Sequence, residues 1–173
     1  MIRSMVLVVI LGLVALPIIA ADPPPQAARG KAIFFDASKK TQCATCHQLG
    51  TEGTPVGPDL TKIARVAPKA FEISMLSTRT VYAKEVETKV KQKFAAMIAA
   101  ENDKEVTLYN LNELPPEKMV VARDSIYAIR DNGTWKHPPE STGYSKEQIA
   151  DVIAFIRFVA TGDTKGVDPA VLK

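Results

Sequence analysis

The stretch Gln42-Cys43-Ala44-Thr45-Cys46-His47 contains both cysteines of this 173-residue chain and one of its two histidines. One turn of chain brings the two sulfur atoms to the edge of one planar ligand and presents the following imidazole to its centre. Cys-x-x-Cys-His is the pattern of covalent haem attachment, and haem iron accepts a proximal histidine. The motif therefore predicts one covalently bound haem c with its iron. Cys43 and Cys46 would carry it, and His47 would be the first iron ligand.

Three other interpretations of the motif fit the sequence less well. A thioredoxin-like redox pair needs a strand before it and a helix after it, whereas residues 39–42 are polar and residues 48–58 form a loop rich in Gly and Pro. A structural disulfide across so short a loop would constrain the unfolded chain little. Structural zinc needs four ligands, usually in separated pairs, and only one further histidine exists.

The loop after the motif contains a candidate partner for His47. Gly57-Pro58-Asp59-Leu60 predicts a turn, in which the Pro58 carbonyl is a free acceptor because proline has no N–H donor beside it. A metal-bound histidine usually has its other ring nitrogen held by a carbonyl or carboxylate. From spacing alone, a plain turn before the next helix is an equally good interpretation.

The sixth iron ligand is a separate question. His137 lies in a loop, and the proline after it can hold a side chain over a haem face without bending a helix. Met75 and Met97 lie in apolar runs and are interpreted as core residues, and Met119 as packing in a strand. The sequence favours His137 and leaves open Met119 or no sixth ligand. Because Met/His ligation raises the potential, ligation by two histidines predicts a low-spin carrier of lower potential.

The N-terminus has the pattern of an export signal. Arg3 precedes the apolar run Met5–Ile19, and small residues precede Asp22, which predicts a signal peptide over residues 1–21. The run is at the short limit for a membrane span, where about 20 residues are comfortable, so an uncleaved anchor is the alternative. Both interpretations place the rest outside the cytoplasm, in the periplasm or an equivalent compartment. The net charge is only +3, and no basic patch indicates nucleic-acid binding.

The remaining chain is predicted as a proline-rich extended tether (22–28), a monohaem domain (29–165) and a C-terminal tail (166–173). Amphipathic patterns predict helices at 29–35, 68–77 and 145–160, and Gly30 would let another backbone approach closely. Five short apolar runs between the last two helices predict strands, which close most economically as a small antiparallel barrel. The expected fold class is a mostly α core of three main helices around one haem, with a β-barrel-like insertion at about 82–130. The five runs are 86–91, 94–100, 106–109, 119–122 and 126–129.

The chain resembles the c-type cytochrome domain named after Planctomycetes, Verrucomicrobia and Chlamydiae. The resemblance covers about Gly30 to Val159 and rests on the Cys-Ala-Thr-Cys-His motif, on Val56-Gly57-Pro58-Asp59-Leu60-Thr61, on the strand-rich middle and on the closing helix. It implies a cytochrome c-like core in which the Pro58 carbonyl holds His47. In that family a Met-Pro pair before the last helix supplies the sixth ligand, and here His137-Pro138 stands in its place.

These features predict an electron carrier that relays electrons between exported redox partner proteins, an exported dehydrogenase among the candidates, and not an enzyme. One alternative is a haem subunit of a larger oxidoreductase complex. A second alternative, if His137 is not an iron ligand, is a five-coordinate haem enzyme or gas sensor. Contact with a membrane is expected only if the N-terminal segment stays uncleaved.

Overall fold

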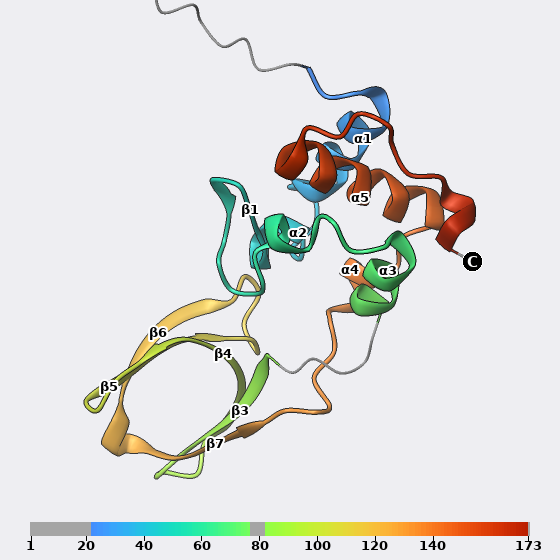
Figure 1. The fold of residues 1–173 in the computed structure, drawn as a ribbon. Helices are drawn as coiled ribbons and strands as arrows, with labels where there is room; N and C mark the ends of the chain where they lie inside the picture. Colours follow the sequence, from blue (N-terminus) through green and yellow to red (C-terminus); the bar gives the residue numbers. More distant parts are fainter. Residues whose placement is uncertain (1–21, 77–81, 173) are drawn as a thin grey trace, which may run out of the picture.

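The computed structural model describes residues 22–76 and 82–172, in which helices and sheet form two separate parts (Figure 1). The predicted signal peptide, residues 1–21, lies outside the described residues. The helical part consists of α1 (Pro25–Phe34), α2 (Cys43–Cys46), η1 (Leu60–Ile63), α3 (Pro68–Leu76), α4 (Pro139–Thr142), α5 (Lys146–Thr161) and η3 (Pro169–Leu172), with a small hairpin of β1 (Gln48–Leu49) and β2 (Glu52–Gly53). The sheet consists of β3 (Ala83–Thr88), β4 (Lys93–Glu101), β5 (Glu105–Asn110), β6 (Glu117–Ala122) and β7 (Ile126–Asp131), with η2 (Arg123–Ser125) before β7.

Helix α1 begins earlier than the sequence predicts. It starts at Pro25, so residues 25–28 of the expected extended tether are helical. Proline suits the first position of a helix because its fixed φ is helical and its missing N–H would have no partner there. The prediction of a tether throughout 22–28 is therefore wrong, because it treated proline only as a residue that ends helices.

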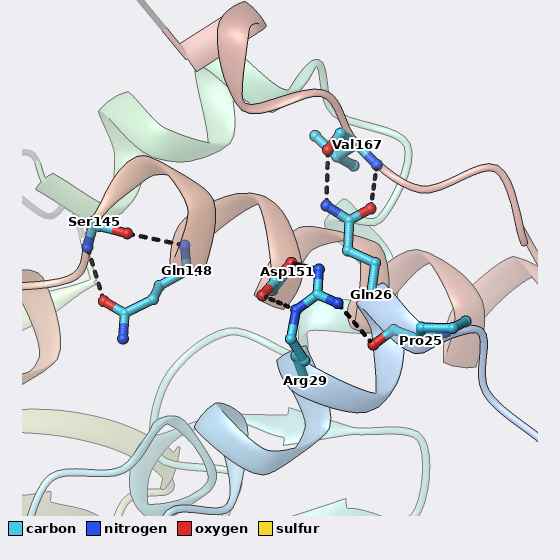
Figure 2. A network of polar contacts seen from close by, with 7 residues as sticks. All are labelled: Pro25, Gln26, Arg29, Ser145, Gln148, Asp151 and Val167. Atoms are coloured by element: carbon cyan, nitrogen blue, oxygen red, sulfur yellow. Dashed lines mark hydrogen bonds and ion pairs between the residues drawn. The ribbon is translucent and has the colours of Figure 1, made fainter.

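Helices α1 and α5 cross at close range, as the glycine in α1 indicated. A Cβ atom built on Gly30 would collide with the backbone carbonyl of Asp151 in α5. The Arg29 guanidinium donates two hydrogen bonds to the Asp151 carboxylate, at 2.8 and 2.9 Å (Figure 2). Beside this pair, Phe34 and Phe155 pack edge to face with ring centroids 5.7 Å apart. This crossing is the centre of the helical core.

Both ends of α5 follow the capping rules. Ser145 and Gln148 form a reciprocal capping box at the start (Figure 2), and Gly162 ends the helix in the left-handed conformation. The predicted tail is packed onto this core: Leu172 is fully buried, and the Gln26 side chain exchanges two hydrogen bonds with the backbone of Val167. None of the helices formed by residues 22–76 and 82–172 has the length and apolar character needed to cross a membrane.

Replacing Gly30 with alanine should destabilise the protein. The added methyl group has no space beside the Asp151 carbonyl, so the two helices must separate, and forced overpacking of this kind costs about 1–3 kcal/mol. Urea unfolding of the haem-loaded protein should show a lower midpoint. Gly143→Ala is the matched control, because its Cβ would meet only the Pro139 carbonyl oxygen, at an ordinary 3.5 Å. Equal midpoints for the two variants would contradict the close crossing.

The sheet has a hydrophobic core of its own. All neighbouring strands are antiparallel, in the order β6-β5-β4-β3-β7, and the sheet is strongly curved (Figure 1). Its buried face holds a cluster separate from the helical core. The members of the sheet cluster that are fully buried are Val86, Ala96, Val106 and Leu108.

The predicted fold class, a mostly α core of three main helices with a β-barrel-like insertion, is wrong in two respects. Helices α1, α3 and α5 form where predicted, but they share the chain with a sheet that extends from Ala83 to Asp131. No barrel is closed within the described residues, because β6 and β7 are the two edges of the sheet. A closed barrel needs its terminal strands paired, whereas η2 redirects the chain so that β7 pairs with β3.

Candidate functional site

A cavity of about 290 Å³ lies between the helical part and the sheet. Most of its wall is apolar, and both parts of the molecule contribute to it. Both cysteines, both histidines and Pro58 line this one cavity, so the structure brings together the five residues that the sequence favours for the haem site. The apolar lining consists of Val56, Leu60, Ile63, Phe71, Met75 and Val152 from the helical part, and Met97, Leu111 and Trp135 from the sheet and the loops beside it.

The Cys-x-x-Cys-His motif forms a single helical turn at the wall of the cavity. The His47 N–H donates to the Cys43 carbonyl at 2.9 Å, and the backbone then becomes extended at His47. The Gly57 N–H donates to the Cys46 carbonyl at 2.6 Å. This second bond ties the loop that follows the motif back against the motif itself.

The cysteines do not have the character of a redox pair. No disulfide joins them, and burial raises the pKa of each thiol to about 11. A thioredoxin-like pair needs a lowered thiol pKa, because the thiolate is the nucleophile. Zinc lacks a site as well, since no group of three or more His, Cys, Asp or Glu side chains in the described residues could hold a metal ion. The alternatives to haem attachment therefore find no support in the geometry.

The predicted contact between His47 and the following loop is present. His47 Nδ1 lies 2.8 Å from the Pro58 carbonyl oxygen, which leaves Nε2 directed away from this bond. Gly57 makes the contact possible, because a Cβ at this position would lie 2.7 Å from His47 Cε1. The motif predicts only a turn at Gly57, and the packing of this glycine against the ring cannot be recognised from the sequence.

His137 lies near His47, and both imidazole rings line the cavity. The centroids of the two imidazole rings are 6.3 Å apart, and the ring planes differ by 24°. A metal bound between two imidazoles, with bonds of about 2.0 Å, separates the ring centroids by about 6 Å. The pair is therefore spaced as two axial ligands of one iron would be, although residues 47 and 137 are far apart in sequence.

Both rings are held in their neutral form. Burial lowers the pKa of His47, and the hydrogen bond with the Pro58 carbonyl opposes this effect. Burial also lowers the pKa of His137, and repulsion from a charged His47 adds to it. Neutral imidazole is the form that binds metals. Both side chains are thus electrostatically suited to iron.

The methionines separate into two groups. Met75 in α3 and Met97 in β4 line the cavity, although the sequence analysis interpreted both as ordinary core residues. Met119 packs against the hydrophobic cluster of the sheet and is not among the residues of the cavity wall. The alternative sulfur ligands for iron are therefore Met75 and Met97, and not the Met119 that the sequence left open.

Thr41 gives an independent indication that the cavity holds a polar-edged ligand. The residue is only 3% exposed, lines the cavity, and its hydroxyl has no hydrogen-bond partner. A buried polar group without a partner is costly, and no sequence pattern around Thr41 indicates it. A haem fits this wall in three respects. Its apolar macrocycle matches the apolar side chains, its iron matches the two imidazoles, and its carboxylate substituents could accept a hydrogen bond from the unsatisfied hydroxyl.

This arrangement defines a haem protein of the c type. The cytochrome c family model matches residues 27–113, half of the chain, and includes the Cys-x-x-Cys-His motif. The chain belongs to the cytochrome c family, and is accordingly a haem-binding electron-transfer protein with covalently bound haem c and its iron. No curated protein matches the chain as a relative.

Proposed function

We propose that this protein is an exported monohaem electron carrier whose iron is bound between His47 and His137, and that it is not an enzyme. Cys43 and Cys46 would hold the haem through thioethers. The observation that carries the proposal is the spacing of the two imidazole rings, whose centroids are 6.3 Å apart. With both axial positions filled by the protein, no position remains for a substrate.

The protein's own residues account for the properties of such a carrier. Bound haem supplies a one-electron change between ferric and ferrous iron. The Pro58 carbonyl orients His47 through Nδ1 at 2.8 Å and makes it a more basic ligand. The apolar wall, with Phe71 and Leu60 at 7% and 6% exposure, excludes water from the site. Because the second ligand is an imidazole and not a thioether, the potential should be lower than that of His/Met members of the family.

Export and partners belong to the same proposal. The charged, apolar and small-residue pattern of residues 1–21 supports export to the periplasm or an equivalent compartment. The resemblance to the Planctomycetes, Verrucomicrobia and Chlamydiae domain supports an exported dehydrogenase as a redox partner. A permanent subunit of a larger oxidoreductase would use the same site, and copurification from the native membrane and soluble fractions distinguishes the two assemblies.

The proposal is tested by spectra of the purified haem-loaded protein. Absorption and electron paramagnetic resonance spectra should show low-spin iron in both oxidation states, and carbon monoxide should leave the reduced spectrum unchanged. Both results follow from two strong protein ligands on the iron. Rapid carbon monoxide binding by the native protein would contradict the proposal and favour a five-coordinate haem enzyme or gas sensor.

A further inference from the structure

The loop that carries His137 is the return connection from the sheet to the helices. It follows β7 directly and ends where Pro138 precedes α4. Among the described residues, no hydrogen bond or ion pair joins the sheet (83–131) to the helical residues (22–76 and 139–172). The position of His137 relative to His47 therefore depends on how this loop is attached at its two ends, to β7 and to α4.

Asn132 makes that attachment. Its N–H donates to the carbonyl of Ala83, a fully buried residue of β3, at 3.0 Å. Its side-chain Oδ1 accepts hydrogen bonds from the Thr134 N–H at 3.2 Å, the Thr134 hydroxyl at 3.0 Å and the Trp135 N–H at 3.1 Å. One side chain thus fixes the turn between the end of the sheet and Trp135.

Trp135 connects the turn held by Asn132 to His137, because its ring packs against the imidazole. The centroids of the Trp135 and His137 rings are 5.3 Å apart and the rings are inclined by 59°. The His137 ring makes no hydrogen bond to any described residue, in contrast to His47 with its bond to Pro58. Pro138 also restricts the backbone of His137, and packing against Trp135 is the ring contact through which the loop itself orients the imidazole.

We propose that Asn132 is a positioning residue for the sixth ligand, through which the sheet holds the His137 imidazole opposite His47. The inference rests on the proposed ligation of iron by His137. The two parts of the molecule then have different roles. The helical part supplies the cysteines that attach the haem and the proximal ligand His47. The sheet positions the distal ligand His137 through Asn132 and Trp135.

Asn132→Ala removes the acceptor and should loosen the His137 imidazole. Losing a residue that orients a metal ligand typically weakens metal binding by about 10- to 100-fold, so the ferric protein should contain at least about tenfold more high-spin iron than the native protein. Carbon monoxide should bind the reduced variant measurably. Asn132→Asp keeps an acceptor oxygen at the same position and should restore the low-spin spectrum. If the alanine variant yields no haem-loaded protein, Asn132→Gln replaces it, because the longer side chain displaces the acceptor oxygen. Asn132→Gln should likewise contain more high-spin iron than the native protein.

Asn102→Ala is the matched control. The Asn102 side chain accepts hydrogen bonds from the N–H groups of Lys104 and Glu105, at 2.8 and 3.0 Å, in the turn between β4 and β5, and Asn102 does not line the cavity. It should lose stability without any change of spin state. A native spectrum for Asn132→Ala, beside a high-spin spectrum for His137→Ala, would overturn this inference and leave the proposed function standing. A native spectrum for both variants would overturn both.

Discussion

Replacing His137 with alanine is expected to convert the haem from low-spin to high-spin and to open the iron to carbon monoxide. The ring centroid of His137 lies 6.3 Å from that of His47, the spacing of two axial ligands, and alanine has no atom that can bind iron. The change should appear in the absorption and electron paramagnetic resonance spectra of the ferric protein. Because one strong ligand is lost completely, this is among the largest effects that any single substitution in the chain should have.

The two cavity methionines provide the controls for His137. Met75→Leu and Met97→Leu keep an apolar side chain of similar volume and remove the sulfur, and such exchanges usually cost less than about 1.5 kcal/mol. Both variants should keep the low-spin spectrum. A high-spin spectrum for Met75→Leu or Met97→Leu, together with a low-spin spectrum for His137→Ala, would assign the sixth ligand to that methionine. Both methionines line the same cavity as His137, and all three side chains are half-buried, so the variants are comparable in burial.

Much of the site could be predicted because its chemistry is local in sequence. The spacing of Cys43, Cys46 and His47 follows from one turn of helix, and a proline carbonyl eleven residues after His47 is an acceptor without a donor beside it. His137 could be proposed only because one further histidine exists in the chain. Its distance from His47, and the presence of Met75 and Met97 in the same wall, depend on tertiary packing that no spacing rule contains.

The sheet shows where local patterns stop being informative. Four of the five predicted runs lie within strands, because alternation and turns are local properties. The run 86–91 is wrong at its end, since β3 stops at Thr88 and Val90 lies exposed in the turn before β4. Strand order is not local: β7 pairs with β3, so β6 and β7 remain edges and the expected barrel does not close. The role of Asn132 was equally hidden, since its partner Ala83 is the first residue of β3, at the opposite end of the sheet segment.

Gly57→Ala should displace the proximal ligand and strongly reduce the yield of correctly ligated protein. The new Cβ would lie 2.7 Å from His47 Cε1, 3.1 Å from Nδ1 and 3.3 Å from Nε2. Real Cβ contacts are essentially never under 3.0 Å. The ring cannot move aside freely, because Nδ1 is bonded to the Pro58 carbonyl at 2.8 Å and Nε2 would be bound to iron. The backbone of Gly57 has no left-handed φ, so no backbone strain adds to this clash.

The measurement for Gly57→Ala is the ratio of haem absorbance to protein together with the spin state of the iron. The variant should show a lower ratio, and the protein that does bind haem should contain high-spin iron, because overpacking of about 1–3 kcal/mol acts directly on the His47 ring. Gly133→Ala is the matched control, since a Cβ at Gly133 meets nothing within 4 Å and its φ is also not left-handed. Gly133→Ala should load haem and remain low-spin like the native chain. If Gly57→Ala does the same, the close packing of this glycine against the proximal histidine does not control ligation.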